Sequence, residues 1–163
     1  MPLIDHSLVS LRSRLDDTTR ESVIAMIRRV QFEESVADSV LTSALSAYPN
    51  EAILLLRGKV LNNAILINDV LIPPLATSGR GFSDFRGIML PMDLRLVGVS
   101  HSHPSGALRP STHDLNHFYG RIMVITAYPF QSYSDIGVFN NHGERIPHEI
   151  VPDQQNDDIS DLP

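Results

Sequence analysis

Residues 99–118 read VSHSHPSGALRPSTHDLNHF, and this stretch decides how the rest of the chain is interpreted. It holds four of the seven histidines of the 163-residue chain. The residues before it, 94–100, are apolar and β-branched, which predicts a buried strand running into His101. Side chains alternate between faces along a strand, so His101 and His103 should point the same way, roughly 6 to 7 Å apart. Two imidazoles placed in this way can converge on one metal ion.

A short helix is predicted to follow the two histidines. Residues 104–106, Pro-Ser-Gly, end the strand, and Ser111 is a suitable N-cap for a helix over 112–120. Asp114 lies in the first turn, so a helix folded back over the strand end would bring its carboxylate to the histidines. Two imidazoles and a carboxylate suit zinc and leave one tetrahedral position open, as a catalytic site requires.

The same residues also allow a simpler interpretation. Ser111 and Asp114 form a Ser-x-x-Asp capping box, which needs no metal. His113 and His117 lie close to Asp114 in sequence, and we expect them to be surface residues or to support the ligands rather than to bind the metal. The joint pattern of a strand, His-x-His-Pro and a capped helix start is more specific than either part alone. It therefore favours the metal site.

The spacing of these residues resembles the motif of the JAMM, or MPN-plus, zinc metalloproteases: His-x-His, seven residues, Ser, two residues, Asp. All four positions match, at His101, His103, Ser111 and Asp114. The resemblance implies that the two histidines and the aspartate hold one Zn2+ ion, and that Ser111 helps to bind the oxyanion of the attacked amide. It also implies an α/β fold, a single cytidine-deaminase-like MPN domain with a curved, mostly antiparallel sheet flanked by helices.

The family further implies an upstream glutamate that acts as general acid and base, and Glu51 stands at the matching position. It follows Pro49 and precedes a predicted strand that begins at Ala52. Leu54 replaces a glycine common in the family pattern, a change that removes no reactive group. In the implied reaction Glu51 accepts a proton from zinc-activated water and passes it to the leaving amine. The alternative is a glutamate that merely starts a surface strand.

Periodicity predicts the remaining elements. Apolar residues at helical spacing indicate a helix over 34–48, and 52–72 is expected to form a hairpin that turns at Asn62-Asn63. Further expected elements are a helix over 18–29, a short edge strand at 30–32, strands at 88–90, 122–126 and 136–139, and a last edge strand at 149–151. Residues 73–87 are rich in Gly, Ser and Pro and predict a long loop, similar in position to an insertion that holds the tail of ubiquitin in JAMM deconjugating enzymes.

Composition sets limits on function. The chain has no cysteine, which excludes disulfides and thiolate metal sites. Its formal net charge of -6 gives no basic field for nucleic acid, so nucleic acid is not an expected partner. No apolar run approaches the ~20 residues of a membrane span and no signal peptide is evident, so we expect a cytoplasmic protein. Three segments are predicted: an N-terminal helical extension, 1–29; a catalytic domain, 30–151; and an acidic disordered tail, 152–163.

Together with the resemblance, the sequence predicts a zinc isopeptidase, similar to archaeal or bacterial deubiquitinase-like proteins. Its expected partners are conjugates of ubiquitin or a ubiquitin-like protein, and contacts with a proteasome or with a second copy of the chain are further expectations. Two alternatives remain. A RadC-like protein linked to DNA repair carries a similar HPSG-type motif, but the weak basicity and Glu51 argue against it. A non-catalytic MPN scaffold of a proteasome-like complex would be expected to lack one or more ligands.

Overall fold

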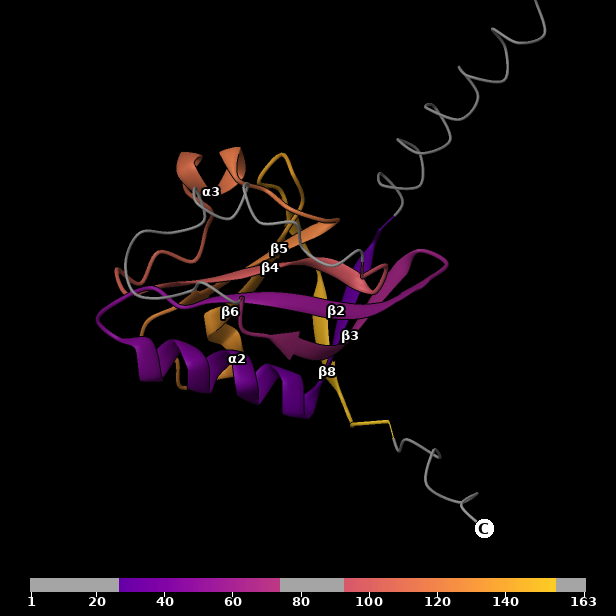
Figure 1. Ribbon diagram of the computed structural model, residues 1–163, viewed down its shortest axis with the longest axis horizontal. Coiled ribbons are helices and arrows are strands. Elements are labelled where there is room, and N and C mark those ends of the chain that lie inside the picture. Colours follow the sequence, from indigo (N-terminus) through magenta and orange to yellow (C-terminus); the bar gives the residue numbers. More distant parts are fainter. Residues whose placement is uncertain (1–26, 74–92, 155–163) are drawn as a thin grey trace, which may run out of the picture.

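One curved sheet runs through the molecule. The computed structural model describes residues 27–73 and 93–154, and within them eight strands are ordered β7-β6-β5-β4-β2-β3-β1-β8 (Figure 1). Four of the seven neighbouring strand pairs in these residues are antiparallel and three are parallel. The strands are β1 (Arg29–Glu33), β2 (Ile53–Leu61), β3 (Ala64–Leu71), β4 (Leu96–His103), β5 (Ile122–Ala127), β6 (Ile136–Phe139), β7 (Arg145–Ile146) and β8 (His148–Val151).

Helices cover both faces of this sheet. Figure 1 shows α2 (Glu34–Ala47) along one face and the short α3 (Thr112–Asn116) on the other side, above the ends of β4 and β5. A 3-10 helix, η2 (Tyr133–Asp135), leads into β6. The predicted fold class, an α/β domain whose curved, mostly antiparallel sheet is flanked by helices, is confirmed.

The main apolar core lies between α2 and the sheet. The helix buries the residues that recur at its own period, Val36, Ala37, Val40, Leu41 and Ala44. They pack with fully buried side chains of the sheet, among them Val30, Phe32, Leu56, Ile65, Ile67, Ile122 and Val138. Each such side chain contributes about 1.5 to 3 kcal/mol when it leaves water. This face therefore holds most of the buried apolar side chains of the described residues.

Most predicted elements are found, and three need correction. The helix over 34–48, the hairpin and the strands through His103, 122–126, 136–139 and 149–151 are present. The strand at 30–32 is not at an edge, because β1 lies between β3 and β8 and pairs parallel with both. The helix after Ser111 ends at Asn116 rather than at Gly120. Gly120 has φ +82, and a Cβ there would lie 2.6 Å from the Val97 carbonyl oxygen, so the chain turns there to enter β5.

The predicted helix over 18–29 is wrong at its end. Residues 27 and 28 form no regular element, and Arg29 already belongs to β1, because Arg28 N–H donates to the Asn63 carbonyl (2.8 Å) as the chain joins the sheet. Residues 18–26, the predicted strand at 88–90, the loop over 74–87 and the tail from 155 lie outside the described residues. The sequence did not predict β7 or η2. No helix in 27–73 or 93–154 is both long enough and apolar enough to cross a membrane.

Candidate metal centre

A strand in the middle of the sheet carries the two predicted histidine ligands. β4 is paired with β2 on one side and with β5 on the other, and the ladder with β5 continues to His103, which lies opposite Ala127. Both imidazoles are buried, with 2% of His101 and 7% of His103 exposed. The alternation of faces predicted for residues 101 and 103 therefore holds. Because β4 is held on both sides, the two rings have little freedom to move apart.

The N-terminal cap of α3 delivers the third predicted ligand. Ser111 Oγ accepts from the Asp114 N–H (3.1 Å), and Asp114 Oδ2 accepts from both the N–H and the Oγ of Ser111 (2.6 Å each). The predicted capping box is thus present. It does not compete with the metal interpretation, because the capping carboxylate is the one that faces the histidines. Asp114 is only 3% exposed.

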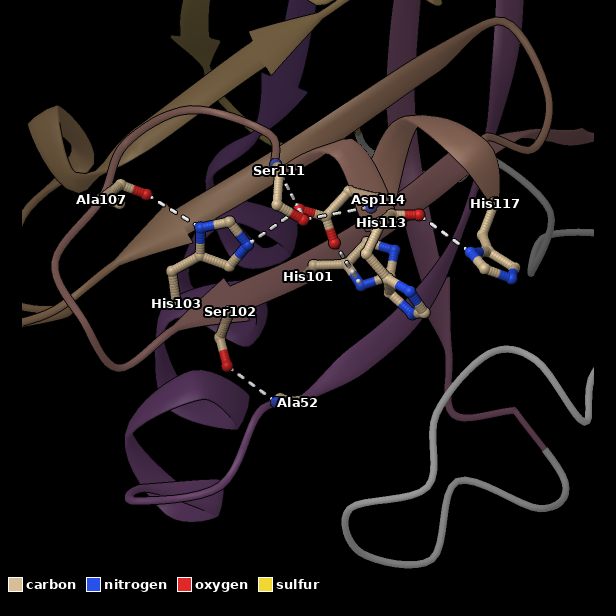
Figure 2. A network of polar contacts seen from close by, with 9 residues as sticks. All are labelled: Ala52, His101, Ser102, His103, Ala107, Ser111, His113, Asp114 and His117. Atoms are coloured by element: carbon tan, nitrogen blue, oxygen red, sulfur yellow. Dashed lines mark hydrogen bonds and ion pairs between the residues drawn. The ribbon is translucent and has the colours of Figure 1, made fainter.

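The three side chains meet between β4 and α3. His103 Nε2 lies 3.3 Å from Asp114 Oδ2, and His101 Nδ1 lies 3.8 Å from Asp114 Oδ1. Figure 2 shows the Asp114 carboxylate between the two imidazole rings. Ala107 lies on one side of the His103 ring, and Ser111 lies on the other side. The sequence predicted that a strand end and a helix start would bring these three groups together. The structure does so.

The donor set fits zinc, although the side chains are packed against one another. Within residues 27–73 and 93–154, no group of three or more His, Asp or Glu side chains stands in an arrangement that could hold a metal ion. Here the two oxygens of Asp114 face different imidazoles. Two imidazoles and a carboxylate are nevertheless ligands that zinc favours, and ligand atoms about 2.0 Å from a tetrahedral ion lie about 3.3 Å apart. The observed separations of 3.3 and 3.8 Å are close to that spacing.

A backbone carbonyl orients one of the histidines. His103 Nδ1 donates to the Ala107 carbonyl oxygen (2.9 Å), so its Nε2 is the atom that faces Asp114. A hydrogen bond of this kind at the second ring nitrogen is what usually fixes a metal-binding histidine. No sequence pattern points to Ala107, since every residue carries a carbonyl and only the path of the loop selects this one.

Burial and hydrogen bonding set the charges of the cluster. Burial lowers the pKa of His101 to about 4, against the opposing influence of the Asp114 carboxylate. Burial alone would also lower the pKa of His103, but its hydrogen bonds and the negative charges of Asp114 and Glu51 raise it above the ordinary value. Burial would raise the pKa of Asp114, yet hydrogen bonds from His103 and Ser111 hold it well below its usual range. Asp114 is therefore a carboxylate and His101 a neutral imidazole at neutral pH, the states that bind metal cations.

Glu51 lies at the end of the strand that neighbours the histidines. Ile53 of β2 is opposite His101 of β4, and two hydrogen bonds link the preceding residue, Ala52, to Ser102. The same register continued by one more residue places Glu51 opposite His103, on the same face of the sheet. Its side chain is exposed, and its charge is among those that act on His103. The structure thus brings Glu51 to the metal-ligand candidates, while its role in proton transfer stays a prediction.

Ser111 is also at the site, and its hydroxyl is hydrogen-bonded to Asp114. Its Oγ donates to Asp114 Oδ2 (2.6 Å), so its single proton points at the carboxylate. The residue itself is exposed at the start of α3. Its predicted part in binding an oxyanion requires this proton to turn away from Asp114, and that part remains a prediction.

The two other histidines of the motif lie at the rim of the cluster. His113 is exposed and His117 is half-buried. Their rings pack together with centroids 4.3 Å apart, and His117 Nδ1 donates to the His113 carbonyl oxygen (2.8 Å). Both lie near enough to His101 for their charges to bear on its pKa. His113 and His117 thus lie around His101, His103 and Asp114, and their expected role as surface residues or supports of the ligands stays a prediction.

Comparisons with known proteins match the chain across this site. A family model described as prokaryotic homologs of the JAB domain matches residues 33–136. A probable metalloprotease of Haloferax volcanii is 36% identical over 114 residues, which cover 66% of this chain and 70% of that protein.

Two solved structures agree with that match. One is described as JAMM, a metalloprotease-like zinc site in the proteasome and signalosome; it is 28% identical, covers 75% of this chain and 97% of its own, and has a TM-score of 0.54. A JAB1/MPN domain protein from Archaeoglobus fulgidus is also 28% identical, covers 74% of this chain and 98% of its own, and has a TM-score of 0.56.

Proposed function

We propose that this chain, which belongs to the prokaryotic homologues of the JAB domain, is a zinc-dependent isopeptidase. Its substrate would be the amide bond that joins ubiquitin or a ubiquitin-like modifier to a target protein. One observation carries the proposal: His101, His103 and Asp114 meet at the end of β4, and the neighbouring strand begins beside them, two residues after Glu51. The metalloprotease relative and the JAMM zinc-site structure support a zinc-type metal.

The three ligand candidates would hold the ion, with one tetrahedral position left open. When bound, zinc supplies Lewis acidity, which polarises an amide carbonyl and brings the pKa of a water molecule to about 7. His101, His103 and Asp114 are all buried, so their interactions with a cation are screened little by solvent. The Ala107 carbonyl keeps the His103 ring in one orientation, so the ring would not have to rotate in order to bind a metal ion.

Two further residues would handle the proton and the developing charge. Glu51 would accept the proton of the attacking water at its carboxylate and return it to the leaving lysine amine. Its exposure suits this task, since it can meet both solvent and substrate. Ser111 would turn its hydroxyl from Asp114 toward the oxyanion, an interaction worth about 3 kcal/mol.

The test is Glu51→Gln in an assay with ubiquitin joined through its C-terminus to a lysine of a reporter protein. The variant should retain bound zinc, measured by elemental analysis, and should lose at least ~100-fold in kcat, because it can no longer accept a proton. Glu149→Gln is the matched control, an exposed glutamate on β8 at the edge of the sheet far from β4, and it should cleave like the parent. A chelator should abolish cleavage by the parent protein.

The same assay separates the alternatives. Full activity of Glu51→Gln would show that Glu51 is not the general base. Parent protein that binds zinc but leaves the conjugate intact would remove the isopeptidase proposal, and binding of duplex DNA in its place would favour the RadC-like alternative. An inert protein that binds neither zinc nor DNA would favour the scaffold.

A further inference from the structure

We propose that Ser102 is a positioning residue that holds Glu51 beside the metal-ligand candidates, an inference that rests on the proposed function. Ser102 lies between the two histidines on β4, so its side chain points to the opposite face, toward α2. Figure 2 shows this arrangement, with the Ser102 side chain directed away from the His103 ring and toward Ala52. Ser102 is 2% exposed and therefore contacts neither solvent nor substrate.

The Ser102 hydroxyl replaces a backbone acceptor at the end of a strand ladder. In a hydrogen-bonded pair of an antiparallel sheet, each residue donates its N–H to the carbonyl of the other. Here Ser102 N–H donates to the Ala52 carbonyl oxygen (2.9 Å), but Ala52 N–H donates to Ser102 Oγ (2.7 Å) instead of to the Ser102 carbonyl. A side chain, that of Ser102, therefore accepts one of the two hydrogen bonds of the last residue pair between the two chain segments.

The paired Ala52 and Ser102 restrict the position of the residue before them, Glu51. The regular pairing of β2 with β4 ends at Ile53, opposite His101, so Glu51 lies beyond the ladder. One planar peptide unit joins Glu51 to Ala52, and the backbone can rotate about only two soft dihedral angles per residue. Holding Ala52 at both its N–H and its carbonyl thus holds the Cα of Glu51 opposite His103, while the side chain of Glu51 remains exposed.

Loss of the hydroxyl would release this end of the strand. Without Oγ, the Ala52 N–H would lack an acceptor in a partly buried place, a state that costs free energy and favours fraying. A shift of about 1 Å in a proton-transfer group can reduce a rate by about 100-fold. The metal ligands would be untouched, since His101 and His103 stay in β4 between β2 and β5.

The test compares Ser102→Ala with Ser100→Ala, both made in the full-length, zinc-loaded protein. Ser100 is a matched control, because it lies on the same strand and faces the same side, and only 3% of it is exposed. Ser102→Ala should exchange the Ala52 amide hydrogen at least ~10-fold faster by NMR. It should also lower kcat by ~10- to 100-fold on the ubiquitin–reporter conjugate, with KM and zinc content unchanged. Ser102→Thr, which keeps a hydroxyl, should restore both properties.

A double mutant distinguishes positioning from a general loss of structure. If Ser102 acts through Glu51, Ser102→Ala should cost no further activity in the Glu51→Gln background. An additive loss in the double mutant would overturn the inference, as would a Ser102→Ala protein whose kcat and Ala52 exchange match those of Ser100→Ala. Failure of the proposed function would look different, because Glu51→Gln would then keep the activity of the parent or the parent would cleave nothing.

Discussion

The two faces of the sheet are covered in opposite ways. On one face a 14-residue helix, α2, packs five apolar side chains onto the main core, and its N-cap residue makes no side-chain capping bond. On the other face a 5-residue helix, α3, buries only Asp114 and is held by a reciprocal capping box. The apolar cluster on that side has four buried members, Val99, Met123, Ile125 and Phe139.

The difference shows how stability and chemistry are kept apart. Apolar burial is non-directional and needs no particular polar partner, so α2 can stabilise the fold without shaping a reactive group. The bonds at α3 are short and directional, and each involves a residue of the candidate site. The same carboxylate starts the helix and faces the histidines. Changes on the two faces should therefore have separable effects.

The largest effect is expected from Asp114→Asn. An amide keeps the size of the side chain and can still accept from the Ser111 N–H, but it loses the charge that binds a cation. Zinc affinity, measured by calorimetric titration, should fall by more than ~100-fold, beyond the cost of losing a residue that only supports a ligand. Asp135→Asn is the control, because Asp135 caps η2 through the Ser132 N–H (3.1 Å) and should leave zinc binding intact. Equal zinc affinity in parent and Asp114→Asn would exclude this residue as a ligand.

A core change on the other face should show the reverse pattern. Val40→Ala removes buried methyl groups from α2 and should lower the free energy of unfolding by about 2 kcal/mol in denaturant titrations. Thr42→Ala, at an exposed position on the same helix, should stay within about 0.5 kcal/mol of the parent. Both variants should bind zinc as the parent does. A large loss of zinc affinity in Val40→Ala would mean that the two faces are coupled.

Ser111→Ala should have a smaller effect on stability. It removes the N-cap hydroxyl of α3, for which the expected loss is about 1 kcal/mol in the free energy of unfolding. The loss should appear locally, as faster amide exchange of Asp114, whose N–H donates to Ser111 Oγ. Ser111→Thr supplies a hydroxyl at the same place and should behave like the parent. Unchanged exchange at Asp114 in the alanine variant would indicate that the cap is held by the backbone alone.

The smallest effect concerns pH and lies on the α2 face. Burial and the Arg145 charge lower the pKa of His148, whose ring contacts Phe32 edge-on at 5.8 Å. The unfolded chain then binds a proton more readily, so the contribution of His148 to stability is complete above its unfolded pKa of about 6.5 and is lost as the pH falls through the lower folded value. His148→Gln should make the decline in denaturant midpoint from pH 7 to pH 5 shallower. The change should persist with a chelator present, and an identical pH slope in the variant would contradict it.

Local patterns were sufficient for most of the fold. Alternation placed His101 and His103 on one face of β4, helical periodicity found α2, and Ser-x-x-Asp marked the start of α3, because each of these features depends on a few neighbouring residues. The sequence also identified Glu51, although only by its resemblance to a family motif. Ser102 carried a signal that was overlooked, a hydroxyl between two histidines at the polar end of a strand that begins with apolar residues.

Only the tertiary structure decided how these pieces meet. The place of β1 between β3 and β8, the end of α3 at Asn116 and the Ala107 carbonyl on His103 depend on which segments lie side by side, and no local pattern encodes that. The sequence by itself determined which side chains could bind a cation and how each would face along its own strand or helix. Bringing Asp114 within 3.3 Å of His103 needed the chain to fold α3 back over the sheet, because the energy of such contacts is gained only after distant residues have been joined.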